Sequence, residues 1–82
     1  MPRMSILVRA EWDPEAQVFV ATSEDVPGLV AEAATPAELH QKLQILIPEL
    51  LDLNLPHAAP ETFQEVPLYI MHEQVSRIKI HA

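Results

Sequence analysis

The feature that most constrains this chain is one amphipathic helix with a well-marked start. Thr35, Pro36 and Glu38 stand where an N-cap hydroxyl, a first-turn proline and a third-position glutamate are favoured. They predict a capping box, in which Thr35 and Glu38 each satisfy the other's backbone N–H. The apolar residues that follow fall on one stripe, at positions Leu39, Leu43, Leu46, Ile47, Leu50 and Leu53. The sequence therefore predicts one helix that buries a single face.

Two residues fit this helix poorly. Pro48 removes the backbone bond to the carbonyl of Gln44 and is expected to kink or loosen the helix there. Ile45 points away from the stripe, either as a singly exposed apolar residue or as a subunit contact. Asn54 is a suitable residue to end the helix.

Apolar and polar residues alternate on both sides of the helix, with the period of two that is typical of strands. The expected strands are 5–11, 17–23, 29–33 and 65–73, and the first two form a hairpin around a turn at 12–16. Residues 75–81 alternate again. They are expected to form a further short strand or a continuation, paired within their own subunit or with another.

The element order β-β-β-α-β predicts an α+β fold of two layers, with one helix packed on one face of an antiparallel sheet. Residues 1–82 are expected to form a single domain. The helix is expected to cover Ile6, Val8, Val18, Val20, Val66, Leu68 and Ile70. The opposite face then carries a second apolar set, which predicts an interface of a homodimer or higher homo-oligomer: Leu7, Phe19, Val30, Tyr69 and Met71.

The corner at 24–28 holds the only glycine of the 82 residues, Gly28, directly after Pro27. A lone glycine indicates a backbone requirement such as a positive φ, so Pro27 and Gly28 are interpreted as a structural turn. Glu24 and Asp25 begin the same corner and are expected to face a partner as an acidic pair.

Charge and composition exclude several classes of function. The net charge is -7, and the five basic residues are scattered along the chain, so direct nucleic-acid binding is not expected. No apolar run reaches membrane-spanning length, and no apolar segment of a signal peptide follows the first residues. With no cysteine there is no disulfide and no thiol nucleophile. A cytoplasmic protein without membrane contact is expected.

A search for reactive groups finds no catalytic, metal-binding or cofactor-binding residues. The four histidines, at 40, 57, 72 and 81, have no metal-ligand spacing, and one glycine forbids a phosphate-binding loop. Trp12 is either a hydrophobic lid over the hairpin turn or a stacking platform for bases. An enzyme remains the third hypothesis, with His72 and the corner of Glu24 and Asp25 as its parts.

Four segments in order resemble small HicB-related bacterial proteins. Residues 10–23 are similar to the opening of that superfamily, 25–30 to its Asp-x-Pro-Gly turn, 35–39 to its helix start, and 46–54 to the helix end of a short uncharacterised branch, a domain of unknown function. Gln17 stands where the family's hairpin commonly has glycine, which predicts a locally different turn or a strained residue.

The resemblance implies an antitoxin-like protein-interaction module without enzymatic activity. Its partner would be a small basic HicA-like toxin, an mRNA interferase whose surface it masks, and an acidic protein suits that task. The 82 residues show no DNA-binding segment of the kind that full antitoxins carry, so autoregulation by DNA binding is not expected. The alternative is a standalone homo-oligomer with a metabolic or small-ligand-binding role.

Overall fold

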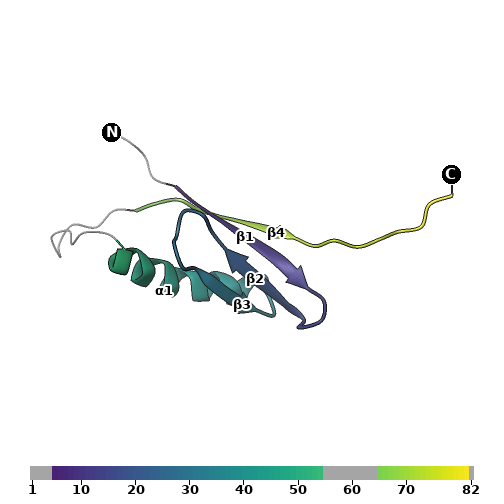
Figure 1. The fold of residues 1–82 in the computed structure, drawn as a ribbon, viewed down its shortest axis with the longest axis horizontal. Coiled ribbons are helices and arrows are strands. Elements are labelled where there is room, and N and C mark those ends of the chain that lie inside the picture. Colours follow the sequence, from purple (N-terminus) through teal and green to yellow (C-terminus); the bar gives the residue numbers. More distant parts are fainter. Residues whose placement is uncertain (1–4, 55–64, 82) are drawn as a thin grey trace.

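The computed structural model describes residues 5–54 and 65–81. Its elements follow the predicted order: β1 (Ile6–Asp13), β2 (Val18–Thr22), β3 (Val30–Ala33), α1 (Pro36–Asn54) and β4 (Leu68–Glu73). The strands form one sheet in the order β3-β2-β1-β4, and α1 lies across one face of it (Figure 1). The predicted two-layer α+β fold with one helix on one face is confirmed.

The sheet is mixed, so the expectation of an antiparallel sheet is wrong for one pair of strands. β1 pairs antiparallel with β2, and β2 with β3, whereas β4 runs parallel to β1. Two hairpin reversals leave β3 parallel to β1, and α1 then carries the chain back along the sheet. β4 therefore starts at the same end as β1 and lies beside it.

The turn between β1 and β2 decides which side chains face α1. It has four residues, 14–17, because Asp13 pairs with Val18. The Asp13 carboxylate accepts hydrogen bonds from the backbone N–H groups of Glu15 and Ala16, at 3.0 and 3.2 Å. Gln17 adopts a φ of 59°, which L-residues rarely do and which agrees with the expected strained residue at this position.

The resulting register corrects the predicted faces of β2. Phe19 lies opposite Trp12, and Ala21 lies opposite the buried Ala10, so Phe19 and Ala21 face α1. Val18 and Val20, which were expected under the helix, lie on the other face. A shift of register by one residue moves every side chain of a strand to the opposite face, and the length of the turn sets that register.

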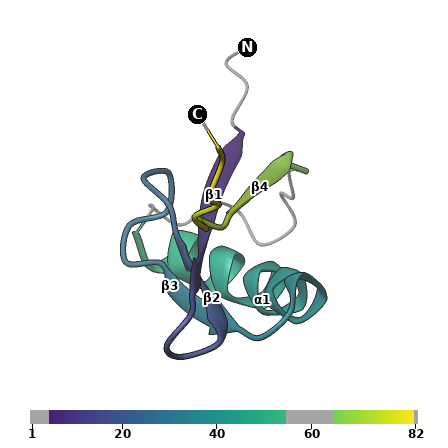
Figure 2. The ribbon, with the colours of Figure 1, turned by 90° about the vertical axis from the view of Figure 1, so that its right-hand side faces the viewer.

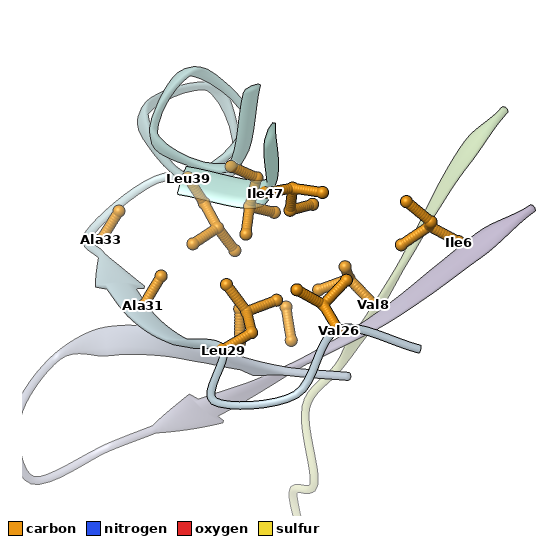
Figure 3. Packing of buried hydrophobic residues seen from close by; sticks show 11 residues of the cluster. Ile6, Val8, Val26, Leu29, Ala31, Ala33, Leu39 and Ile47 are labelled. Atoms are coloured by element: carbon orange, nitrogen blue, oxygen red, sulfur yellow. The ribbon is translucent and has the colours of Figure 1, made fainter. Parts of the chain in front are cut away.

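The core lies between α1 and the sheet, and Figure 3 shows its side chains converging there. Leu39, Leu43 and Ile47 of α1 are buried, and half-buried leucines of the helix pack around them. The sheet supplies Ile6, Val8 and Ala10 from β1 and small residues from β2 and β3, which are Ala21, Ala31 and Ala33. The alanines let α1 approach β2 and β3 closely, whereas β4 is only partly covered (Figure 2).

The helix has the predicted bounds, but the predicted capping box at its start is only half formed. Thr35 Oγ1 accepts a hydrogen bond from the backbone N–H of Glu38 at 3.1 Å, which is one half of the capping box. No bond from the Thr35 N–H back to the Glu38 carboxylate is formed within the described part of the chain. Pro48 lies within one continuous helix, and Ile45 is 64% exposed on its outer side.

The corner before β3 contains the turn expected from Pro27 and Gly28. The backbone N–H of Leu29 donates to the carbonyl of Val26 at 3.1 Å, and Gly28 has a φ of 83°. Proline and glycine at the two central positions are the preferred residues of a type II turn. Val26 and Leu29 on either side are buried, so the turn inserts two apolar side chains into the core.

Candidate protein-interaction surface

The sheet face turned away from α1 is not covered by any described element, and we call it the open face. A row of residues crosses all four strands on this face, because Glu32 pairs with Val20, Val20 with Glu11, and Glu11 with Glu73. All three glutamates are exposed. Sequence reasoning missed this acidic row, because it depends on the register that the hairpin turn sets.

Apolar side chains lie on one side of the acidic row, toward the start of β1. Four of the five residues predicted as an interface lie on the open face and are exposed: Leu7 (40%), Met71 (47%), Tyr69 (57%) and Val30 (70%). Leu7 pairs directly with Tyr69, and Arg9 with Met71. The Nε of Arg9 lies 3.8 Å from Oε1 of Glu73, so one cation partly offsets the row at its β4 end.

The fifth predicted interface residue, Phe19, belongs to the other face. Its ring meets that of Trp12 edge to face at a centroid distance of 4.9 Å, and that of His72 at 5.0 Å. Edge-to-face pairs of aromatic rings stabilise a fold by more than the burial of their apolar area alone. Trp12 and His72 therefore take part in a structural aromatic cluster at the end of the core.

The two acids of the corner have different surroundings. The Asp25 carboxylate accepts a hydrogen bond from the backbone N–H of Leu7 at 2.8 Å, and the hydroxyl of Ser23 donates to the Leu7 carbonyl at 2.6 Å. Asp25 thus supports β1 where that strand extends beyond its ladder with β2. Glu24 and Asp25 are both exposed, so both carboxylates of the predicted acidic pair can face a partner, and that of Asp25 has a structural role as well.

The corner borders a shallow depression of about 640 Å³ on the open face. Polar and apolar groups line it together, from Leu7, Arg9, Glu11, Thr22, Ser23, Glu24 and Asp25. A second depression of about 640 Å³ lies between α1 and the first residues of β1 and β4, where His40, Ile47 and Leu68 are among the lining residues.

Two further observations concern the described residues, 5–54 and 65–81. They contain no group of three histidine or carboxylate side chains placed to hold a metal ion. None of their helices has the length and apolar character needed to cross a membrane.

The fold and this surface define a small α+β domain with an uncovered, acidic and partly apolar sheet face. The family model of a domain of unknown function, DUF1902, matches residues 5–82, and the chain belongs to this family. The expected membership of an uncharacterised family is thereby confirmed. No protein of curated function matches the chain.

A solved structure supports the same architecture. The chain is 40% identical to a hypothetical protein from the extremely thermophilic bacterium Thermus thermophilus, with a TM-score of 0.65. The match covers 94% of this chain and 100% of the other. Neither comparison assigns the chain to the HicB-like superfamily, and that resemblance stays a prediction.

Proposed function

We propose that this protein is a non-enzymatic, HicB-like interaction module of antitoxin type. In this role it binds a small basic HicA-like mRNA interferase and masks the surface with which that toxin binds RNA. The observation that carries the proposal is the acidic row of Glu11, Glu32 and Glu73, which lies beside exposed apolar side chains on the open face.

The chemistry of such a partner matches this face. A protein that binds RNA presents Lys and Arg to the phosphates, and a row of carboxylates competes for the same groups. The neighbouring Leu7, Tyr69 and Met71 offer apolar area, which a stable protein interface needs at its centre. Charge supports the approach of the partner, and apolar contact supports its retention.

The cellular setting follows from the proposed partner. An interferase acts on mRNA, so we place the interaction in the cytoplasm. The net charge of -7 opposes direct contact with nucleic acid. In this proposal the protein acts on RNA cleavage solely through the toxin.

The test begins with a search for a small basic open reading frame next to the gene of this protein, and it uses the purified product of that frame as the interferase. Addition of the protein should stop RNA cleavage at an equimolar ratio, and the pair Glu11→Lys with Glu32→Lys should weaken binding by about tenfold or more. The pair Glu49→Lys with Asp52→Lys on the exposed side of α1 is the matched control, since it makes the same charge change away from the open face. Full inhibition by the row variant, or none by the native protein, would refute the proposal.

A second candidate is a standalone homo-oligomer that binds a small ligand. The depression bordered by Arg9, Glu24 and Asp25 favours it, because polar and apolar groups meet there. A compound that binds the native state there raises the melting temperature. A compound screen in which Arg9→Ala abolishes a thermal shift would favour this candidate over the antitoxin role.

A further inference from the structure

The last described segment, residues 74–81, leaves the fold. It continues from β4 past the end of the sheet, and Figure 1 shows it projecting away from the body of the protein. Its three aliphatic side chains are largely in solvent: Val75 is 90% exposed, Ile78 81% and Ile80 78%. We call this segment the arm. A chain that extends apolar side chains beyond its own core provides contacts for another surface.

The arm has a pattern that suits a strand in a sheet. Ile78 and Ile80 occupy even positions, whereas Arg77 and Lys79 occupy odd ones, so a strand would present isoleucines on one face and basic groups on the other. The arm contains no carboxylate, and all twelve Asp and Glu residues of the chain lie outside it. Its charge is therefore opposite to that of the body.

We propose that the arm adds as a strand to the outer edge of β4 in a second copy of this chain, and that the two copies exchange arms about a two-fold axis. An added strand gains affinity from backbone hydrogen bonds along a free edge. The proposal does not depend on the binding of a basic toxin, because backbone pairing along the edge of the sheet carries it and its contact with the acidic row is confined to Glu73.

The two edges of the sheet differ in what occupies them. At β3, the Lys42 ammonium donates a hydrogen bond to the backbone carbonyl of Glu32 at 2.6 Å, and a lysine at an edge hinders pairing with another strand. At β4, the Ile6 N–H donates to the Pro67 carbonyl at 3.0 Å, so the backbone groups of odd-numbered residues point toward β1. Those of the even-numbered residues between them, such as Ile70 and His72, therefore point outward. No hydrogen bond within the described part of the chain uses these outward groups.

The lengths of the two segments agree. The eight residues of the arm span about 26 Å as a strand, and the six residues of β4 span about 20 Å. A two-fold axis normal to the sheet leaves every side chain on the same face of the sheet in both copies. In an antiparallel pair about this axis, even-numbered residues of one copy therefore lie opposite even-numbered residues of the other. Two registers meet this condition and pair the arm with most of β4. In one the two-fold axis passes beside Gln74, and in the other it passes beside Val75.

Both registers bring compatible side chains together. On the side of α1, Ile80 lies opposite either Leu68 or Ile70, which the helix leaves half-buried. On the open side, Arg77 lies directly or diagonally opposite Glu73, at the end of the acidic row. Each arm thus covers apolar surface that α1 does not reach and supplies a cation where carboxylates gather.

Light scattering on the full chain tests the exchange at micromolar concentration. The native protein should have twice the 9.2 kDa mass of one chain, and Ile78→Asp with Ile80→Asp should give the monomer with an unchanged circular dichroism spectrum. Ile45→Asp, at a 64% exposed site on α1, is the matched control and should stay dimeric. A monomeric native protein, or an arm variant that remains dimeric, would overturn the proposal.

Cysteine crosslinking tests the position of the axis. Because the chain has no native cysteine, Gln74→Cys or Val75→Cys should form a disulfide-linked dimer under mild oxidation, and Ile45→Cys should not. If neither arm variant crosslinks more than Ile45→Cys, the strands do not meet there and the proposal fails. Toxin inhibition measured on the same variants separates this outcome from failure of the proposed function.

Discussion

Asp25 accepts a hydrogen bond from the backbone N–H of Leu7 across eighteen positions of sequence, with 2.8 Å between Oδ2 and the nitrogen. Ser23 completes the arrangement, since its hydroxyl donates to the Leu7 carbonyl and accepts from the Asp25 N–H. Two side chains thus take the place of a neighbouring strand at the start of β1. The corner whose acidic residues are predicted to face a partner therefore also has a structural role.

We expect Asp25→Ala to lower the free energy of unfolding by about 1–2 kcal/mol, because it removes a charged acceptor from an otherwise unpaired backbone N–H. Urea denaturation measures this change. Glu24→Ala, the adjacent exposed carboxylate, is the matched control and should change stability by less than about 0.5 kcal/mol. Equal effects of the two variants would contradict a structural role that is specific to Asp25.

Gly28→Ala should destabilise the protein by about 1 kcal/mol through the backbone alone. The added Cβ has room, since the nearest atom is Cδ2 of Leu50 at 4.0 Å, whereas the φ of 83° is unfavourable for alanine. Gly28→Asn should recover part of the loss, because asparagine tolerates positive φ better. Thermal unfolding of both variants checks the order, and an asparagine variant less stable than the alanine variant would contradict it.

Thr35→Ala should cost about 1 kcal/mol, as the loss of an N-cap hydroxyl typically does. Thr35→Ser keeps the acceptor for the Glu38 N–H and should stay close to the native stability. The unfolding midpoint in urea is the measurement. An unchanged midpoint with an unchanged m value in the alanine variant would show that Thr35 does not cap α1.

Most elements of the fold could be predicted from short local patterns in the sequence. The start of α1 follows from Thr35 and Pro36, and the turn before β3 follows from Pro27 and Gly28, because each conformation depends on residues within one turn of chain. The direction of β4 was less accessible. The direction of β4 relative to β1 depends on how many times the chain reverses before it reaches the edge of the sheet. The residues of β4 themselves carry no information about the number of reversals.

The faces of β2 could not be read from its alternation. Val18, Phe19 and Val20 are all apolar, so the period of two leaves both assignments open. The four-residue turn with Gln17 at positive φ sets the register and so places Phe19 under α1. The acidic row depends on the same register, since only in it does Glu11 lie opposite Val20, the residue that pairs with Glu32 on the other side.

Phe19→Asp should therefore destabilise the fold rather than simply separate subunits. It puts a carboxylate among Trp12, His72 and the edge of the core, and we expect a loss of about 2 kcal/mol or more. Val30→Asp, at a 70% exposed site on the open face, is the control and should change stability by less than about 0.5 kcal/mol. A native melting temperature for Phe19→Asp would contradict the observed faces of β2.

The last prediction concerns the kinetics of binding to a basic partner. Glu24 and Glu11 are exposed on or beside the open face, and long-range attraction acts before contact, so Glu24→Lys with Glu11→Lys should lower the association rate and flatten its salt dependence. Asp25 is left unchanged, because its bond to Leu7 would mix stability with binding. The pair Glu49→Lys with Asp52→Lys, at two exposed sites on α1, controls for the change in net charge. Stopped-flow measurements at several salt concentrations separate the two rates, and an effect confined to dissociation would place these carboxylates inside a buried contact.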